Sequence, residues 1–378
     1  MSKPYIQNNV KFAIVSTGRR PDTTRSYDLD MCWRDTGGNF STIPQYFKDQ
    51  GYYTINVGKI FHPGSSGCNN DKEYSWSETP YTGGGESIWE GKEFSWRLVE
   101  PEDDEQNAQK DRYLTDYAIE KLRERAPDAL AGVQPFFLGL GFARPHLPLI
   151  AARQYYDLYP EADISIASNP YVPENLPTIA WSSWGELQEY EDIAALGVDG
   201  SFNTSLPDYY AIDVRRAYYA TVSFIDALFG EVLAELDALG LANDTVVVLL
   251  SDNGYQLGEH SEWCKHTNFE VASQVPLMFR IPGVTDGGRG RKTNAFAELV
   301  DVFPTLVEAA GLPTVPMCPL DSSQVRVCHE GHSLVELAQQ EREWKSAAFF
   351  QYPRYSGTKM GYTIRTTDYQ YVKWVEFR

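Results

Sequence analysis

The sequence predicts an α/β fold, in which helices flank a largely parallel central sheet and a smaller antiparallel sheet lies near the C-terminus. Residues 246–250 form an unbroken apolar run rich in β-branched side chains, as in strands buried on both faces of a parallel sheet. Stretches with helical periodicity alternate with such runs along the chain. Residues 347–351 and 362–374 have the pattern of strands of the second sheet, which we expect to be truncated because the chain stops at Arg378.

The elements of the main sheet follow from local signals. Ser41 or Thr42 can cap a helix that Gly51 ends, and residues 52–57 alternate as a strand does. The further elements are expected at residues 113–125 (helix), 135–141 (buried strand), 213–239 (amphipathic helix ended by Gly240), 275–281 (strand) and 298–310 (helix ended by Gly311).

Two long stretches lack sustained periodicity. Residues 64–112 are rich in Gly, Ser, Trp and acidic residues, and we interpret them as a long insertion over one face of the sheet. Residues 151–207 are rich in Pro and Tyr, and they predict a connection with little regular structure.

The chain of 378 residues carries a formal net charge of -19. This charge argues against nucleic acid as a partner, because binding phosphates requires a basic surface. An anionic substrate would also be repelled at long range, so local cations or a metal ion would have to overcome the field at the site. The acidity is equally consistent with ordinary solubility. No apolar run approaches the ~18 residues that a membrane span needs, so we expect none.

Several features favour the secretory route, although no signal peptide is visible at the amino terminus. Glycosylation sequons begin at Asn39, Asn203 and Asn243. Cys318 and Cys328 flank a short loop and could close it as a disulfide, which an oxidising compartment permits. The other cysteines (Cys32, Cys68 and Cys264) have no obvious partners and no metal-type spacing, so we expect them to be ordinary thiols.

The first group of candidate site residues follows the strand at residues 246–250. Asp252 and Asn253 offer the hard oxygen ligands that Ca²⁺ or Mg²⁺ prefers, and ligands bind at this end of strands in open α/β sheets. An Asp-Asn-Gly turn without a metal is the alternative. The next dozen residues are crowded with titratable groups, which a simple connection does not need. These groups are Glu259, His260, Lys265 and His266.

Two other strand ends carry candidate residues. Lys59 and His62 lie just after residues 52–57, where a lysine and a histidine can hold an oxyanion and move a proton. Each of them alone would more commonly be a solvated surface group. His146 follows the strand at residues 135–141 and is held in an extended segment by a proline on each side. A packed loop histidine is an equal alternative for His146.

This set of residues resembles the sulfatase family of the alkaline phosphatase-like superfamily. Residues 51–62, GYYTINVGKIFH, match the second signature of the family, in which GY-x-T runs into GK and then FH. The likeness extends from about residue 16 to the end of the chain. Further matches lie at residues 17–25, 38–44, 144–148, 251–254, 257–260, 262–263, 265, 351–354, 361–362 and 364–366. Cys318 and Cys328 stand where such an enzyme has a disulfide.

The resemblance implies hydrolysis of a sulfate ester on a glycan, as in glycosaminoglycan degradation, in a lysosomal or extracellular protein. One Ca²⁺ ion would grip the sulfate oxygens. The resemblance implies that Asp252 and Asn253 bind the metal and that Lys59 and Lys265 bind the sulfate group. His62 would lie beside the nucleophile, and His146 would contact the sulfate or protonate the departing alkoxide. Arg144 and Tyr255 would bind the substrate.

The sequence departs from the family at its beginning. The family's nucleophile is a formylglycine, made from a cysteine or serine in a C-x-P-S-R segment, but Asn8 stands at that position and no Asp pair precedes it. We therefore expect a catalytic domain over residues 1–340 that is incomplete at its amino terminus and lacks a core strand. Residues 341–378 would be the incomplete start of a C-terminal subdomain.

Two alternatives remain open. The first is a non-catalytic relative, or an inactive fragment, that binds sulfated glycan through Lys59, Arg144 and Lys265. The second is a phosphohydrolase of the same superfamily, which the GK-to-FH signature disfavours.

Overall fold

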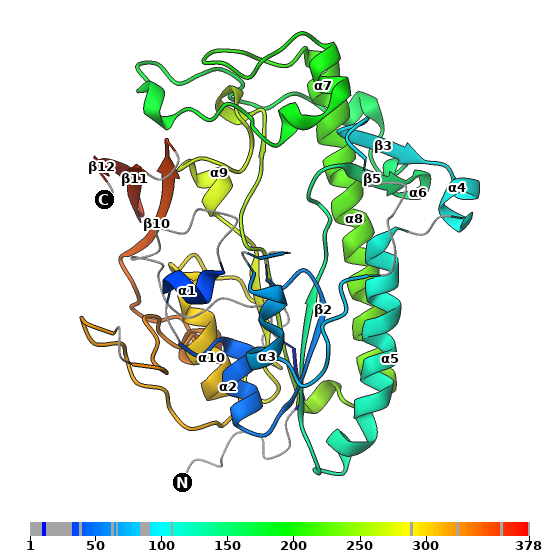
Figure 1. Cartoon of the computed structure of the whole chain (residues 1–378), viewed down its shortest axis with the longest axis vertical. Coiled ribbons are helices and arrows are strands. Elements are labelled where there is room, and N and C mark those ends of the chain that lie inside the picture. The colour runs from blue at the N-terminus through cyan, green and yellow to red at the C-terminus, as the bar shows by residue number, and fades with distance from the viewer. Residues whose placement is uncertain are drawn as a thin grey trace.

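The structure is a computed structural model of the whole chain (Figure 1). It describes residues 10–12, 32–37, 40–61, 64–65, 67–83, 91–106, 109–287, 290–322, 325–355 and 358–376.

The main sheet has five strands and confirms the predicted α/β class. Their order is β2 (Tyr53–Gly58), β4 (Phe136–Gly141), β1 (Val10–Phe12), β6 (Thr245–Leu250) and β9 (Leu277–Arg280). The first four strands are parallel, and β9 pairs antiparallel to β6. The short β1 pairs with both β4 and β6 and so occupies the centre of this sheet.

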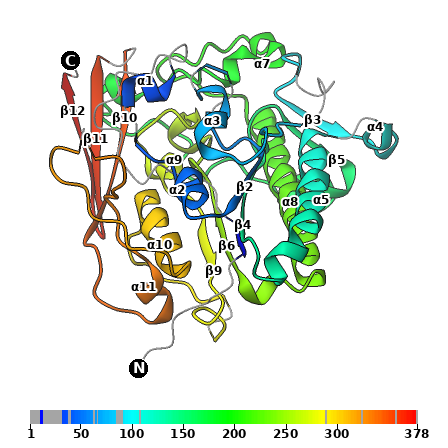
Figure 2. The same ribbon diagram turned by 60° about the horizontal axis from the view of Figure 1, so that its bottom comes forward.

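Helices cover both faces of this sheet (Figures 1 and 2). On one face, α5 (Lys110–Leu130) and α8 (Asp208–Ala238) run side by side. On the other face lie α2 (Ile43–Asp49), which Thr42 caps as expected, and α10 (Val302–Ala309). Apolar side chains of these helices form buried clusters with the strands, and burial of this kind is the main favourable term in folding.

The long helix α8 begins five residues before the predicted start and buries the predicted stripe, which includes Ala217, Phe224 and Leu236. By length and composition alone, α8 would also pass as a membrane span. The core helix of a globular protein passes the same test, and the α8 stripe packs into apolar clusters with other parts of the chain.

Glycines bring the carboxyl ends of β2 and β4 together. Gly58 has a φ of +80°, and a Cβ atom there would lie 2.0 Å from the carbonyl oxygen of Gly141. A Cβ atom on Gly141 would likewise lie 2.1 Å from the carbonyl oxygen of Lys59. Because both side chains are missing, the Lys59 amide donates to the Gly141 carbonyl at 2.7 Å, which fixes the backbone of Lys59 at the sheet edge.

The insertion at residues 64–112 contains more structure than the sequence predicts. It includes η1 (Asn69–Asp71), α3 (Lys72–Ser75), β3 (Trp96–Val99) and α4 (Pro101–Gln106). Strand β3 pairs in parallel with β5 (Leu149–Ala152), so the insertion is tied to the segment that follows His146.

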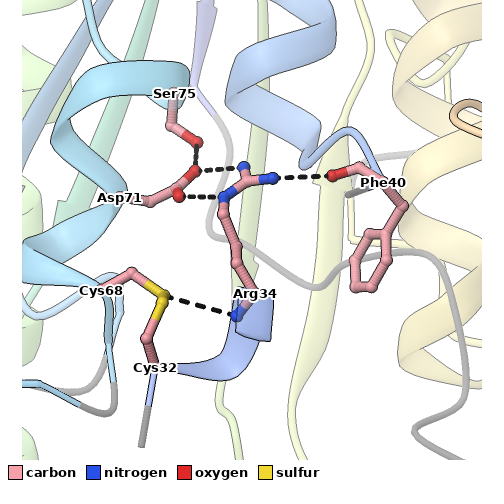
Figure 3. Close-up of a disulfide and its surroundings, with 6 residues drawn as sticks. All are labelled: Cys32, Arg34, Phe40, Cys68, Asp71 and Ser75. Carbon is pink, nitrogen blue, oxygen red and sulfur yellow. Dashed lines mark hydrogen bonds and ion pairs between the residues drawn. A yellow bond between two sulfur atoms is a disulfide. The ribbon is translucent and has the colours of Figure 1, made fainter. Parts of the chain in front are cut away.

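A disulfide joins Cys32 to Cys68, so the expectation of ordinary thiols is wrong for these two cysteines (Figure 3). Their 36-residue separation gives no pairing signal, and only the fold places α1 (Trp33–Gly37) against the insertion. Beside the bond, the Arg34 guanidinium pairs with the buried Asp71 carboxylate, which Ser75 also contacts. Cys264 is a buried free thiol, as expected.

The connection at residues 151–207 contains only short helical segments, which confirms the prediction of little regular structure. These are α6 (Arg153–Tyr156), η2 (Glu161–Asp163), η3 (Thr178–Ala180), η4 (Leu187–Glu189) and α7 (Glu191–Ala195). The remaining small elements are η5 (Ala242–Asp244), β7 (Gln256–Leu257), η6 (Glu259–Ser261), β8 (Trp263–Cys264), α9 (Glu270–Ser273), η7 (Leu299–Asp301) and α11 (Val335–Gln339).

The predicted second sheet is present and antiparallel. It consists of β10 (Ala347–Arg354), β11 (Lys359–Thr366) and β12 (Gln370–Glu376), and it stands apart from α5 and α8 (Figure 2). The Asn268 side chain ties it to the loop after β8 by donating to the Gly361 carbonyl at 3.0 Å. The predicted disulfide between Cys318 and Cys328 is formed.

Candidate active site

The carboxyl ends of three parallel strands and the end of β8, which belongs to a separate antiparallel pair, bring four of the predicted site residues together. Lys59 follows β2, His146 follows β4, Asp252 follows β6 and Lys265 follows β8. Lys59 is within electrostatic reach of both Asp252 and Lys265, and His146 is within reach of Lys59 and Lys265. The predicted convergence is therefore present, while the role of each residue stays a prediction.

Glu186 lies at the centre of this group, and sequence reasoning missed it. Its Oε1 atom lies 3.0 Å from Lys265 Nζ, 3.4 Å from His266 Nε2 and 3.8 Å from His146 Nε2. Burial favours the protonated carboxyl, but the His266 hydrogen bond and the Lys265 charge outweigh burial and hold the pKa of Glu186 at about 2. The site thus contains an ionised carboxylate.

The His146 ring is oriented by its own loop. Its Nδ1 atom donates to the Leu147 carbonyl at 2.8 Å, since a carbonyl can only accept. The neutral ring therefore presents an unprotonated Nε2 toward Glu186. Burial lowers the pKa of His146 and the Lys265 charge lowers it further, against the Leu147 bond and Glu186, which raise it.

The Lys59 ammonium is held in a partly desolvated, cationic environment. Burial lowers the pKa of Lys59, and repulsion from Lys265 adds to this effect, while Asp252 opposes it. A second cation, Arg144, is buried beside the buried carboxylate of Asp111, which accepts the backbone N–H groups of Ala143 and Arg144. Burial raises the pKa of Asp111, and the Arg144 charge opposes the rise.

A cavity of about 210 Å³ opens beside these cations. Lys92 and Tyr190, from the insertion and the Tyr-rich connection, line it together with Lys59, Arg144 and His146. The Lys92 ammonium lies 4.6 Å from the centre of the Tyr190 ring and 2.6 Å from a Glu189 oxygen. An anionic ligand in this cavity would therefore meet charges contributed by segments that are far apart in the sequence.

Asp252 and Asn253 follow β6 as predicted, and their role as metal ligands stays a prediction. Asp252 is exposed next to Lys59, and the Asn253 amide nitrogen donates to the Gly254 carbonyl at 2.7 Å, which leaves its amide oxygen available. A hard oxygen pair suits Ca²⁺, which takes roughly six to eight oxygen ligands. Within the described residues no group of three or more His, Cys, Asp or Glu side chains could hold a metal ion.

Tyr255 forms part of the wall behind the site. Its ring stacks on Tyr218 with centroids 5.2 Å apart, and its hydroxyl donates to Cys264 Sγ at 3.3 Å. Burial raises the pKa of the Cys264 thiol to about 12, so this cysteine is unreactive. The predicted contact between Tyr255 and substrate stays a prediction.

Two of the titratable residues that follow β6, Glu259 and His260, make contacts that stabilise the loop. Glu259 accepts from the Leu257 amide at 2.6 Å and pairs with Arg215 at 3.1 Å. His260 stacks on Phe269 with centroids 4.4 Å apart. His62 and Asn8 lie outside the described residues.

The residues that sequence reasoning missed lie in the two stretches without periodicity. Lys92 belongs to the insertion, and Glu186 and Tyr190 belong to the Tyr-rich connection. The sequence places His266 among the titratable residues after the strand at residues 246–250 but indicates no role for it at the site. No local pattern distinguishes these residues, although the Trp-rich sequence around Glu186 could have indicated a packed segment, since Trp184 is fully buried.

Comparison with known proteins agrees with the geometry. The sulfatase family model matches residues 12–312, and the model for the C-terminal part of N-sulphoglucosamine sulphohydrolase matches residues 258–377. The chain is 39% identical to iduronate 2-sulfatase of Mus musculus and 38% identical to that of Homo sapiens; each match covers 96% of this chain and 75% of the relative.

The fold is also similar to solved structures. A structure of BT4656 in complex with its substrate D-glucosamine-2-N,6-O-disulfate covers 98% of this chain and 83% of its own, with a TM-score of 0.61 and 19% identity. The family model spans most of the chain, and the identity to two relatives exceeds 30% over three quarters of their length. The chain therefore belongs to the sulfatase family, whose members are sulfuric ester hydrolases.

Proposed function

We propose that this protein removes sulfate from a glycan, in the manner of iduronate 2-sulfatase. The observation that carries the proposal is the convergence of Lys59, His146 and Lys265 beside Asp252 at one edge of the sheet. A tetrahedral sulfate group fits a site where ammonium groups approach from several segments, because its negative charge is then neutralised on more than one side.

The chain's own residues would divide the work. Lys59 and Lys265 hold the charge of the sulfate group, and Arg144 lies at the wall of the same cavity. When a nucleophile attacks the sulfur, the bond between sulfur and the sugar oxygen breaks and its electron pair stays on that oxygen, which is a strong base. Protonated Nε2 of His146 faces the site and would transfer its proton to this oxygen. Because burial lowers the pKa of His146, the protonated form requires an acidic medium.

We also propose that Asp252 and Asn253 supply two ligands of a calcium ion. Such an ion would act as a Lewis acid on the sulfate oxygens. The nucleophile of the family would be a formylglycine, but the sequence contains no C-x-P-S-R segment. We therefore derive no step through that group.

The sugar would occupy the cavity on the side away from the strand ends. Lys92 and Tyr190 line that cavity, and the stacked pair Tyr255 and Tyr218 lies near the same loops. An aromatic and cationic wall is suited to a sulfated or carboxylated sugar, because sugars pack on aromatic faces and cations attract the anionic groups.

Several features support a secretory route to a lysosomal or extracellular location. Two disulfides, Cys32–Cys68 and Cys318–Cys328, are formed, and disulfides persist in oxidising compartments. The sequon residues Asn203 and Asn243 are exposed and could carry glycans. We also keep the division into a catalytic part over residues 1–340 and a C-terminal part over residues 341–378 as a proposal.

A second candidate function is binding of sulfated glycan without hydrolysis. The observation that favours it is Asn8, which stands where the family has its convertible cysteine. The cations of the site would still bind the anion, because Lys59 and Arg144 in the cavity wall, and Lys265 within electrostatic reach of Lys59, do not depend on that position.

One experiment separates the two functions. The chain is incubated with a disaccharide that carries a 2-sulfated uronic acid, and binding is measured by calorimetry while released sulfate is measured by ion chromatography. Hydrolysis predicts sulfate release that Lys265→Ala abolishes, and the phosphate ester of a matched alcohol should react more slowly. Binding without release, by this chain and by a version extended at its amino terminus, would establish the second function. No binding of the disaccharide would refute both.

A further inference from the structure

The Glu186 carboxylate is unusual for a site built to hold an anion. In the proposed function Lys59 and Lys265 bind the negative charge of the sulfate group. Glu186 Oε1, however, lies 3.0 Å from Lys265 Nζ and competes with the sulfate for this ammonium group. Its Oε2 atom is buried and has no hydrogen-bond partner within the part of the chain that the structure describes. A buried carboxylate oxygen without a partner is costly, so a role other than packing is expected for this residue.

The Glu186 backbone is fixed by its neighbours in the connection. Trp184 is fully buried, and its indole N–H donates to the Ser261 carbonyl at 3.1 Å. Ser182 donates its amide to the buried carboxylate of Glu262 at 2.7 Å, and the buried Leu187 follows Glu186 directly. The carboxylate is therefore delivered to the site by a packed segment.

The position of Oε1 is fixed by Lys265 and His266, and this oxygen faces the His146 ring. Lys265 and His266 bind it at 3.0 Å and 3.4 Å, and His266 is itself held by stacking on Tyr352 with centroids 5.7 Å apart. His146 Nε2 lies 3.8 Å from the same oxygen, which is beyond hydrogen-bond length but close enough for charge to matter.

We propose that Glu186 is the positioning residue of His146, since its Oε1, anchored by Lys265 and His266, places a negative charge opposite Nε2 and favours the protonated ring. The inference rests on the proposed function, in which His146 donates a proton to the leaving oxygen. Glu186 does not touch the reacting atoms and acts only through the histidine.

The charged groups around His146 explain why such a residue is needed. Lys59 and Lys265 both face the ring and disfavour its protonation, and the Arg144 guanidinium lies 3.4 Å from the His146 carbonyl. Of the described groups that act on the ring, only Glu186 is an anion; the other contribution that favours protonation is the Nδ1 bond to Leu147. The positive charges of the lysines that hold the sulfate would therefore keep the His146 ring neutral, and so unable to donate a proton, unless a nearby anion compensated for these charges.

The test is a titration of the histidine rings by NMR on the intact, metal-free chain in sulfate-free buffer. The chain has six histidines, and the His146 signal is assigned by its loss in His146→Gln. In Glu186→Gln the midpoint of His146 should fall by about one pH unit or more. The buried His329, whose Nδ1 donates to the Gly331 carbonyl, should not move and serves as the internal reference.

Two further variants keep the result interpretable. Glu191→Gln removes an exposed carboxylate five residues away and should leave the His146 midpoint unchanged. Glu186→Asp keeps the charge on a shorter arm, so its midpoint should lie between those of the wild type and Glu186→Gln. A His146 midpoint in Glu186→Gln within about 0.2 units of the wild type would overturn the inference.

Binding of inorganic sulfate to the same samples separates this inference from the proposed function. Glu186→Gln should bind sulfate at least as tightly as the wild type, because a competing negative charge is removed and both lysines remain. Weaker binding by tenfold would mean that Glu186 mainly holds Lys265 in place, and it would overturn the proposed role. A wild type that binds no sulfate would refute the proposed function, while the shift of the His146 midpoint would still decide the role of Glu186.

Discussion

The buried ion pair beside the Cys32–Cys68 disulfide makes a quantitative prediction about stability (Figure 3). The Asp71 side chain is completely buried and that of Arg34 is 9% exposed. Arg34 Nη2 donates to Asp71 Oδ2 at 2.7 Å and to Gln45 Oε1 at 3.0 Å, and Nη1 donates to the Phe40 carbonyl at 3.1 Å. These bonds lie within one small region around α1, where Arg34 meets Phe40, Gln45 and Asp71.

The magnitude follows from what each substitution leaves behind. Arg34→Met keeps most of the volume but leaves the Asp71 carboxylate buried without a cation, which should cost roughly 3–5 kcal/mol. Asp71→Asn keeps the hydrogen bond to Ser75 and leaves Arg34 with neutral acceptors, so it should cost about 2 kcal/mol. The double variant should be less damaging than the sum by about 2 kcal/mol, because neither charge is then left unpaired.

The assay is urea unfolding of the oxidised protein, followed by tryptophan fluorescence, with the four proteins measured side by side. The control pair is Arg112 and Glu231, whose side chains are 28% and 49% exposed, and Arg112→Met there should cost no more than about 1 kcal/mol. If the effects of Arg34→Met and Asp71→Asn add to within about 0.5 kcal/mol, the reasoning that the two charges depend on each other is refuted.

Three further predictions concern the disulfide, the sheet edge and pH. Replacing both Cys32 and Cys68 by Ser opens a loop with a sequence separation of 36, which should cost about 4 kcal/mol on the chain-entropy model, measured by urea unfolding; a change below about 1 kcal/mol would contradict it. Gly58→Ala places a Cβ atom 2.0 Å from the Gly141 carbonyl oxygen at a φ of +80°, so it should destabilise the fold by about 2 kcal/mol or more. It should also weaken sulfate binding, because the backbone of Lys59 would shift. The control is Gly51→Ala, which has a similar φ but no atom within 4 Å and should therefore cost only the backbone strain. Burial raises the pKa of Glu262 to about 8, although the Ser182 amide and Arg354 act to lower it. Because this pKa in the folded protein lies above the ordinary glutamate value of 4.5, the stability contributed by Glu262 is fully present below about pH 4.5 and is lost as the pH rises toward 8. The wild type should lose unfolding free energy on the order of 3 kcal/mol between pH 5 and pH 8, and Glu262→Gln should not show this loss when thermal unfolding is measured across the same range. If the unfolding free energy of the variant depends on pH as steeply as that of the wild type, Glu262 is not the group that titrates.

Three residues of the candidate site could be predicted from the sequence, because each of them follows an apolar run that indicates a buried strand. Lys59, His146 and Asp252 were found by their place after residues 52–57, 135–141 and 246–250, since the carboxyl ends of parallel strands share one edge. Glu186 could not be found this way, because it lies in a connection without periodicity and more than 75 residues from Lys265. The same limit hid Lys92 and Tyr190.

What the sequence determined by itself was the α/β class, the helices and strands with strong periodicity, and the set of side chains at the strand ends. Periods of 2 and 3.6 residues are local properties, so they are visible without the fold. Only the tertiary structure decided that β1 fills the centre of the sheet, that Cys32 pairs with Cys68 and that one carboxylate oxygen gathers Lys265, His266 and His146. These outcomes depend on which distant segments the folded chain places side by side, and no local pattern carries that information.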